Sequence, residues 1–466
     1  MTGVVVLTVM SFQGTWGGGS RGEAPTRQEI ERRCWQVLQE ASGAEGWETR
    51  WFAAHALRYL GDRRLLPFVE KLLMDPHAEV RLAAGEAALE LGWAPGAAVY
   101  RDLLAQKLKA DPAARAWVVG KLQDLKSVEF LLGCLQASDA RVRADAAWAL
   151  GEIGDLRGRE TLERLSQTDP VAAVRAAASG ALYRCEESPR VARLQPFLTG
   201  GDPLAAEQAV RALIERIDNR AIAARPFQVE ALLRVLRHGP PRAQGWAALG
   251  LGRTKLLWLF PPLQRRFERA EGAVQVCLAT ALLQVRSGSQ TFFDQFTLEM
   301  FKVWGAMLQA CDEHYSDLWD IEHLLLGMLA VPDCHAAQIL QRLGVDLSLL
   351  RRRLVERVES AEYRQQQRQE YDRKVREAPW LALPLDDERR PRLSGERVGD
   401  VFDLAAEEAK KVQRVGSEYC LLGVVKYEDI VQRDLLTDLG VSVEKVRALM
   451  QSMKGKWQGE EDLLDQ

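Results

Sequence analysis

The chain has 466 residues, of which 47% are hydrophobic and 27% charged, and its formal net charge is −3 at pH 7. That length allows more than one hydrophobic core. A charge so close to balance lacks the positive surplus that is typical of proteins that bind nucleic acid or membranes. The composition therefore indicates neither a nucleic-acid nor a membrane partner.

The start of the chain carries little structural signal. The apolar run 4–10 is far shorter than the roughly 20 residues that a membrane-spanning helix needs. It also lacks the basic flank and the cleavage pattern of a signal peptide, and Met10 offers an alternative start of translation. Residues 14–22 are rich in glycine, so 1–27 is predicted to be a disordered lead-in.

The cysteines indicate a reducing compartment. They are odd in number, scattered, and never spaced as Cys-x-x-Cys, so we expect buried thiols in a cytoplasmic protein and no disulfide framework. The seven are Cys34, Cys134, Cys185, Cys277, Cys311, Cys334 and Cys420.

From residue 28 to 288 one unit repeats. The pattern Val-Arg-x-Ala/Asp-Ala begins at Val80, Val142 and Val174, and weaker copies fill the gaps. A regular period of this length is typical of stacked helical repeats. The markers stand 28 to 35 residues apart, at positions 50, 81, 115, 143, 175, 207, 242 and 275.

Each unit is predicted to be a pair of helices. A leucine-rich helix precedes a turn, which in four units is Asp-Pro, and an alanine-rich helix follows. The aspartate can cap the second helix and proline suits its first position. We expect the marker arginines to form a ladder with acidic neighbours and the tryptophans to fill the core. The acids considered for the ladder are Glu79, Glu86 and Asp145.

These repeats resemble HEAT repeats of the short bilin-lyase type, because Asp-Pro, Val-Arg and Ala-Ala stand at their usual places. Ankyrin and tetratricopeptide repeats share the period, but their signatures do not occur. The resemblance implies an α-solenoid of about eight units that offers a binding surface. It leaves open a bilin-lyase-like subunit that acts on a chromophore or phycobiliprotein, and a nucleic-acid-binding protein.

A second pattern occurs twice after residue 291. Glu322-His323-Leu324-Leu325-Leu326-Gly327 corresponds to Glu418-Tyr419-Cys420-Leu421-Leu422-Gly423. In each copy a Leu-Gly-Val segment follows, so that Gly344 and Gly440 each stand 17 residues after the first glycine. Apolar residues at helical spacing surround both motifs and predict several short helices in each copy.

The duplicated pattern resembles the Clp repeat, a helical unit found in tandem at the N-terminus of Clp chaperones. The copies cover 292–358 and 394–452, with a charged linker at 359–393 that starts as a helical extension, and an acidic tail at 453–466. In the family this domain docks adaptors and substrates, in some members through acids that receive a modified arginine side chain. The resemblance implies binding roles for Thr297, Glu322, His323, Glu418 and Tyr419.

Other interpretations of these residues stay open. Each glutamate stands at the start of a predicted helix, where an acid is favoured as a cap. Only Ser394 or Gly395 is near the place in the second copy that corresponds to Thr297.

Recognisable catalytic motifs do not occur in the sequence. There is no Gly-x4-Gly-Lys-Ser/Thr loop, and Gly252-Arg253-Thr254-Lys255 has the wrong spacing. The closest approach to a set of metal ligands lies within 311–335, but the six histidines of the chain are scattered, and in a helical protein such histidines usually pack or titrate at the surface, so we expect no metal, no cofactor and no enzymatic activity. That set is Cys311, His314, His323, Asp333, Cys334 and His335.

The sequence thus predicts an all-α protein, with a HEAT-like solenoid followed by a small tandem Clp-repeat domain. The favoured function is a non-catalytic scaffold or adaptor that recognises Clp components or their clients.

Overall fold

The structure, a computed structural model, divides into two compact units, whose main parts are residues 30–294 and 295–457. The predicted lead-in and acidic tail fall almost wholly outside the described residues. No single described helix is long and apolar enough to cross a membrane, although one pair bent by 88°, 321–330 with 335–342, passes by length and composition alone. The described residues are 26–109, 111–155, 157–185, 191–215, 225–286, 296–314, 316, 318–377, 393–394, 396–409, 415–431 and 435–453.

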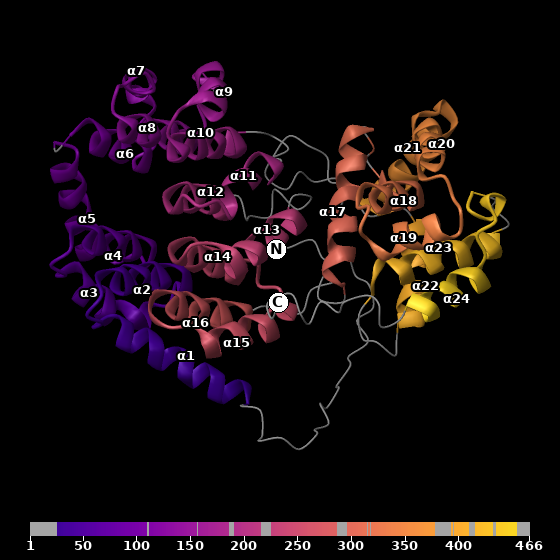
Figure 1. Ribbon diagram of the computed structural model, residues 1–466, viewed down its shortest axis with the longest axis horizontal. Coiled ribbons are helices and arrows are strands. Elements are labelled where there is room, and N and C mark those ends of the chain that lie inside the picture. Colours follow the sequence, from indigo (N-terminus) through magenta and orange to yellow (C-terminus); the bar gives the residue numbers. More distant parts are fainter. Residues whose placement is uncertain are drawn as a thin grey trace. The chain divides into compact units, whose positions relative to one another are not determined.

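The first unit is built from paired helices (Figure 1). Short 3-10 turns at 63–65, 125–127, 191–193 and 257–259 precede four of them. The helices are α1 (Arg27–Ala41), α2 (Trp47–Leu60), α3 (Leu66–Leu73), α4 (Ala78–Glu90), α5 (Ala94–Lys107), α6 (Pro112–Lys121), α7 (Val128–Cys134), α8 (Ala140–Ile153), α9 (Arg159–Thr168), α10 (Ala172–Cys185), α11 (Gln195–Leu198), α12 (Pro203–Glu215), α13 (Arg225–His238), α14 (Pro241–Thr254), α15 (Phe260–Arg269) and α16 (Gly272–Arg286).

The even-numbered helices from α2 to α16 form a row, and each of them carries one of the eight marker positions. Successive members of the row pack together except at one step, between α4 and α6, where α5 packs on both helices. Small residues allow this close approach. A Cβ added to Gly120, Gly151 or Gly252 would come within 2.7 Å of a Cα in the next helix of the row. The described residues of the first unit therefore form eight successive pairs of helices, α1 to α16.

The solenoid closes on itself, which the sequence did not indicate. The last helix of the row, α16, packs against the first, α2. Gln284 Nε2 donates to the carbonyl of Tyr59 at 2.8 Å, and Arg242 Nε lies 3.1 Å from Glu48 Oε1. The ring of Trp246 meets that of Trp51 edge-on at 5.6 Å. The repeats thus form a closed ring whose joint brings together residues about 200 positions apart.

The predicted ladder of marker arginines is present, but its acidic partners were predicted wrongly. Arg50 Nε lies 2.6 Å from Asp75 Oδ2, and Arg143 Nε lies 2.8 Å from Asp169 Oδ2. Each aspartate belongs to the next Asp-Pro turn, so the turn supplies the ion pair between neighbouring units. The acids proposed from sequence pair elsewhere: Glu79 with Lys107, Glu86 with Arg58 and Lys121, and Asp145 with Arg141.

The second unit is a compact group of helices with one two-stranded parallel sheet. A 3-10 turn spans 437–439. Its elements are α17 (Leu298–Glu313), β1 (Leu318–Trp319), α18 (Ile321–Ala330), α19 (His335–Arg342), α20 (Leu347–Glu359), α21 (Ala361–Glu377), β2 (Leu393–Ser394), α22 (Glu396–Ala409), α23 (Ser417–Val431) and α24 (Val443–Met453).

The two copies are related by a pseudo-twofold arrangement. In the first, Gly327 lets α18 approach α17, and a Cβ there would lie 2.6 Å from the carbonyl oxygen of Val303. In the second, Gly423 stands at the same 2.6 Å from the carbonyl oxygen of Val401. Gly344 and Gly440 both adopt left-handed backbone, with φ of 80° and 76°. The glycines that define the sequence motif therefore hold equivalent places.

The copies also exchange their leading segments. Leu318 of the first copy pairs in parallel with Leu393 of the second, and Phe296 of the first pairs with Val415 of the second. Each copy thus contributes the segment before its first helix to the other copy. This exchange places the start of α22 beside α18 and the start of α17 beside α23.

The region 359–393, expected to be a charged linker with a helical start, contains α21. Tyr363 and Tyr371 of this helix are buried, and Gln367 is nearly so. The helical part therefore packs against the second unit, while 378–392 lies outside the described residues.

Candidate docking site

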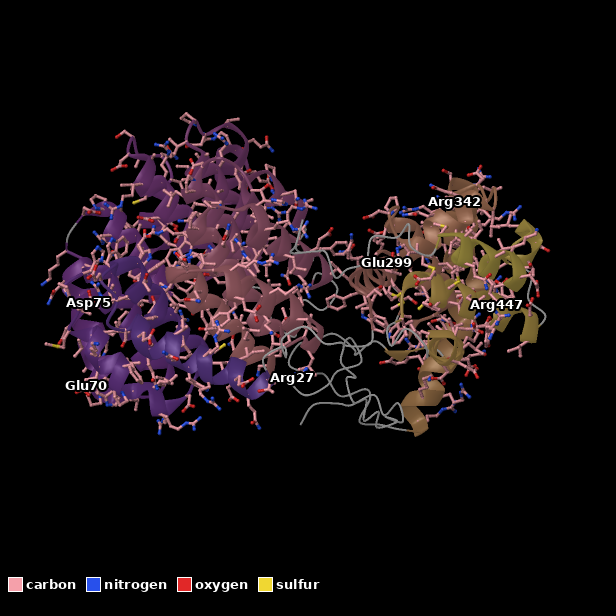
Figure 2. The ribbon with its side chains drawn as sticks, turned by 60° about the horizontal axis from the view of Figure 1, so that its bottom comes forward. Arg27, Glu70, Asp75, Glu299, Arg342 and Arg447 are labelled. Atoms are coloured by element: carbon pink, nitrogen blue, oxygen red, sulfur yellow. The ribbon has the colours of Figure 1, made fainter. Side chains whose placement is uncertain are left out.

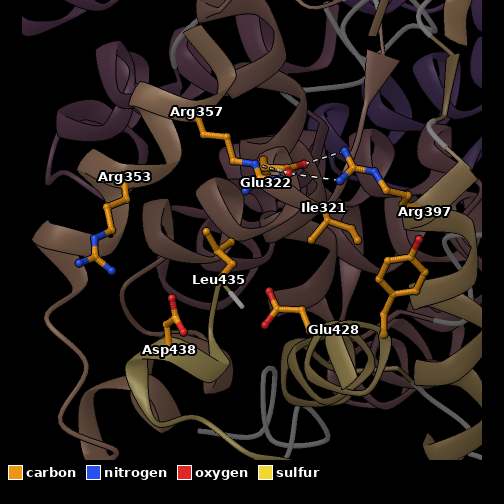
Figure 3. Close-up of a pocket in the computed structure, with 9 residues that line it drawn as sticks. Ile321, Glu322, Arg353, Arg357, Arg397, Glu428, Leu435 and Asp438 are labelled. Carbon is orange, nitrogen blue, oxygen red and sulfur yellow. Dashed lines mark hydrogen bonds and ion pairs between the residues drawn. The ribbon is translucent and has the colours of Figure 1, made fainter. Parts of the chain in front are cut away.

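Within the second unit, a pocket of about 240 Å³ opens where the first copy of the duplicated pattern meets the second (Figure 3). Three arginines and three acids line it, and Ile321, Tyr427 and Leu435 supply its apolar surface. Arg353 and Asp438 are exposed at its rim, whereas Glu322 and Glu428 are buried. The arrangement offers both signs of charge to a ligand within one concave surface. The charged lining residues are Glu322, Arg353, Arg357, Arg397, Glu428 and Asp438.

Glu322, one of the acids predicted to bind a ligand, forms ion pairs with two arginines of the chain itself. The guanidinium of Arg397 lies 3.1 Å from Glu322 Oε2, and Arg357 Nε lies 2.9 Å from Glu322 Oε1. Tyr363 donates its hydroxyl to Glu322 Oε2 at 3.3 Å. Arg397 also forms an ion pair with Asp320. We call Asp320, Glu322 and Arg397 the first seam, because Arg397 comes from the second copy and the acids come from the first.

The first seam perturbs its two carboxyls in opposite directions. Burial opposes ionisation of Glu322, but Arg397 and Arg357 outweigh it and lower the pKa of this carboxyl. Burial, with repulsion from Glu322, raises the pKa of Asp320 to about 6 against the attraction of Arg397. One arginine thus serves two buried acids, and of the two Glu322 is the more strongly favoured in its ionised form.

The capping box of α18 is formed by residues other than Glu322. Asp320 accepts a hydrogen bond from the Ile321 N–H at 2.8 Å, and the Asp320 N–H donates to His323 Nδ1 at 3.3 Å. These two residues form a capping box. Burial lowers the pKa of His323 to about 4, so its imidazole is neutral and accepts this bond. His323 is fully buried and supports the helix start from within.

Thr297 and Tyr419 lie on the other side of the pseudo-twofold. Thr297 donates its N–H to the carbonyl of Val415 at 3.2 Å, and its hydroxyl accepts from the Met300 N–H at 3.2 Å. It therefore caps α17 next to the exchanged segment. Tyr419 is half-buried in the first turn of α23.

Glu418, the second predicted acid, has a histidine as its partner. His335 Nδ1 lies 3.0 Å from Glu418 Oε2 and 3.1 Å from Glu299 Oε1. The Ser417 N–H and hydroxyl both donate to Glu299 Oε1, at 3.0 and 2.9 Å. Glu299 comes from the first copy and is labelled in Figure 2. We call Glu299, His335 and Glu418 the second seam.

The structure therefore brings the predicted residues to two equivalent seams, not to one site. Sequence reasoning missed Arg397 and Glu299, which complete the seams. Arg397 stands four residues before Val401, whose carbonyl oxygen lies next to Gly423. Glu299 likewise stands four residues before Val303, whose carbonyl oxygen lies next to Gly327. Alignment of the two copies on their glycines was the signal that could have found them. Ligand binding by the five predicted residues stays a prediction.

The histidines and cysteines considered as metal ligands separate into different surroundings. His314 pairs with Glu359, Asp333 with Lys302, and the Cys334 thiol accepts from the Ala337 N–H in the first turn of α19. Burial raises the pKa of Cys334 to about 12, so it stays a thiol. His335 contacts two carboxylates, those of Glu299 and Glu418, and neither acid was in the set.

Comparisons with known proteins agree with this division of the chain. A family model described as HEAT repeats matches residues 101–182, a HEAT repeat model matches 65–91, and the Clp repeat (R) N-terminal domain matches 296–378. A probable ATP-dependent Clp protease ATP-binding subunit of Chlamydia pneumoniae is 30% identical over 128 residues. That match covers 27% of this chain and 12% of the relative.

Among solved structures, human deoxyhypusine hydroxylase in complex with glycerol is similar at 19% identity, covering 56% of this chain and 98% of that chain with a TM-score of 0.23. Neither this structure nor the Clp subunit matches the chain over its whole length. The chain carries HEAT repeats followed by a Clp repeat N-terminal domain.

Proposed function

We propose that this protein is a non-catalytic adaptor that binds other proteins through the HEAT ring and the Clp-repeat unit, and that it links clients to a Clp-type chaperone or protease. The observation that carries the proposal is the joining, in one chain, of HEAT repeats to a Clp repeat N-terminal domain with a relative among Clp ATP-binding subunits. Repeat rings offer extended binding surfaces, and a docking domain offers a second one.

The pocket at the first seam is the surface that we assign to docking. Arg397 is held by two acids, so its charge is neutralised within the protein. Arg353 and Asp438 are exposed at the rim and face solvent. A partner segment that carries charged side chains of both signs would complement this rim, and charges there would mainly set the rate and specificity of association.

The marker arginines support a protein partner over nucleic acid. Arg50 and Arg143 each form a close ion pair with the aspartate of the next unit. Paired in this way, their charges are not offered to phosphates, whereas binding to nucleic acid depends on many uncompensated cations. The seven free cysteines, six of them buried, support the proposed cytoplasmic location.

The test uses the full chain with the purified Clp ATPase and peptidase of the same organism. Arg353→Glu reverses a charge at the pocket rim, and Arg352→Glu makes the same change at the neighbouring exposed residue, which does not line the pocket. We expect direct binding to the ATPase or to a client, weakened about tenfold or more by Arg353→Glu and unchanged by Arg352→Glu. Absence of binding, or equal binding by both variants, contradicts the proposal.

A further inference from the structure

The second seam gathers a nitrogen and two carboxylate oxygens from three helices. His335 begins α19, Glu299 lies in the first turn of α17, and Glu418 lies in the first turn of α23. One ligand atom from each residue lies within 4.8 Å of the other two. The imidazole Nδ1 lies 3.1 Å from Glu299 and 3.0 Å from Glu418. The three atoms converge on one point between the two copies.

The first seam shows what a balanced version of this arrangement contains. There the pseudo-equivalent of Glu299 is Arg397, a permanent cation that compensates two buried acids. In the second seam this cation is replaced by another acid, so Glu299 and Glu418 face each other across His335. Two carboxylates in so confined a place repel each other unless a positive charge lies between them.

We propose that the second seam binds a divalent transition-metal ion of the Zn²⁺ type, with His335 Nδ1 and one carboxylate oxygen from each of Glu299 and Glu418 as ligands. Imidazole and carboxylate together suit zinc, and three protein ligands with one water complete a tetrahedral site. Ligand atoms around tetrahedral zinc lie about 3.3 Å apart. The 3.0 and 3.1 Å from His335 Nδ1 to the two carboxylates are within a few tenths of an ångström of this separation, and the two carboxylate oxygens lie within 4.8 Å of each other.

The groups behind these ligands fix their orientation. Glu299 Oε2 accepts from the His335 N–H at 2.8 Å, and Glu299 Oε1 accepts from the Ser417 N–H and hydroxyl. The Ser417 hydroxyl in turn accepts from the Ala336 N–H at 3.0 Å. Hydrogen bonds of this kind hold metal-ligating carboxylates in place and support affinity. An ion here would cross-link the first copy to the second.

The experiment measures Zn²⁺ binding by the full chain after removal of metals with a chelator. Zinc is titrated in competition with a chromophoric chelator, and Co²⁺ is used in parallel because its visible spectrum separates nitrogen and oxygen ligands from thiolate. We expect one equivalent of zinc and a cobalt spectrum without a thiolate band. We also expect zinc to raise the melting temperature.

His335→Gln removes the nitrogen ligand but keeps a side chain that donates hydrogen bonds to carboxylates. We expect it to weaken zinc binding about tenfold or more and to lose the zinc-dependent rise in melting temperature. Glu418→Gln serves as a second variant with the same expected loss. His314→Gln is the matched control, since His314 pairs with the single carboxylate of Glu359 at 3.2 Å, and it should bind zinc as the wild type does.

Two results overturn the proposal. One is a wild-type chain that takes up no zinc or cobalt at millimolar concentration, which leaves His335 as a hydrogen-bonding partner of the two acids. The other is zinc binding that persists unchanged in both His335→Gln and Glu418→Gln, which places the metal elsewhere.

Discussion

The two units of this protein are both tandem repeats that close on themselves, and they close with different chemistry. In the ring, α16 meets α2 through a cluster of aromatic residues, in which Trp246 contacts Trp51, Phe52 and His55. In the Clp-repeat unit, the copies meet through polar contacts at two seams, an arginine with two buried acids at the first and a histidine with two acids at the second. The first joint relies on apolar area and the second on paired charge.

The difference matters because the two kinds of contact fail in different ways. An aromatic joint loses stability in proportion to the area removed, with little dependence on pH. A buried ion pair is costly to break from one side, because the remaining charge stays in a medium of low dielectric constant. The seams also diverge from one another, since equivalent positions hold Arg397 and Glu299. The following changes test this contrast, beginning with the largest effect.

Removal of the aromatic joint should open the ring. Trp246 is 3% exposed, and Trp246→Ala is expected to lower the free energy of unfolding by about 3–5 kcal/mol. Circular dichroism in denaturant measures the change in the full chain. Trp117→Ala is the control, since Trp117 is only partly buried and packs with Trp148 away from the joint. An equal loss in both variants would show that the joint is not special.

Removal of the cation at the first seam should be nearly as severe. Arg397→Ala leaves Asp320 and Glu322 buried without their shared partner, so we expect a loss of about 3–5 kcal/mol. The same denaturation experiment applies. Arg353→Ala, at an exposed arginine on the rim of the same pocket, should change stability by no more than about 0.5 kcal/mol. A loss near that value for Arg397→Ala would mean that the seam does not hold the copies together.

The second seam should make stability depend on pH when metal is absent. Burial and the neighbouring Glu418 raise the pKa of Glu299 to about 7, from an ordinary value of 4.5. The folded state then binds a proton that the unfolded state has lost, so stability falls as pH rises from about 4.5 to 7, by up to about 3 kcal/mol.

Glu299→Gln cannot titrate and should remove this part of the pH dependence. The measurement is the difference in unfolding free energy between the variant and the wild type at several pH values, in the presence of a chelator. The wild type should lose stability relative to the variant with increasing pH, and a difference that stays constant would contradict the assigned pKa.

The motif glycines should behave alike in the two copies, because each lies equally close to a carbonyl oxygen of the helix before it. A Cβ at Gly327 or Gly423 would lie 2.6 Å from a carbonyl oxygen, so each change to alanine is expected to cost about 1–3 kcal/mol. Gly399→Ala is the control within α22, where no atom lies within 4 Å of the added Cβ. It should be neutral or stabilise by up to about 1 kcal/mol. A large difference between the two motif glycines would reject their equivalence.

Much of the fold could be predicted from the sequence because it depends on local patterns. The marker spacing predicted a repeated pair of helices, and the glycines at 327, 344, 423 and 440 identified the duplicated unit. The arginine ladder was expected as well, but its partners were not, since Arg50 and Asp75 meet only when neighbouring units stack.

The candidate site could be predicted only in part. The motif predicted Glu322 and Glu418 as binding residues, but it did not predict that Arg397 would contact the first and His335 the second. These contacts depend on the exchange of leading segments between the copies, in which Leu318 pairs with Leu393 and Phe296 with Val415. Nothing in the sequence of either copy by itself indicates that the start of its first helix will contact the acid of the other copy.

The sequence by itself therefore determined the repeat units, their helices and the family resemblances, since periodicity, capping residues and glycines act over a few positions. The tertiary structure decided that the solenoid closes into a ring, that Glu322 faces two arginines and that Glu418 faces a histidine. The physical reason is that these results depend on contacts between residues far apart in the chain, such as Gln284 with Tyr59 and Arg397 with Glu322. Such contacts form only when whole units pack.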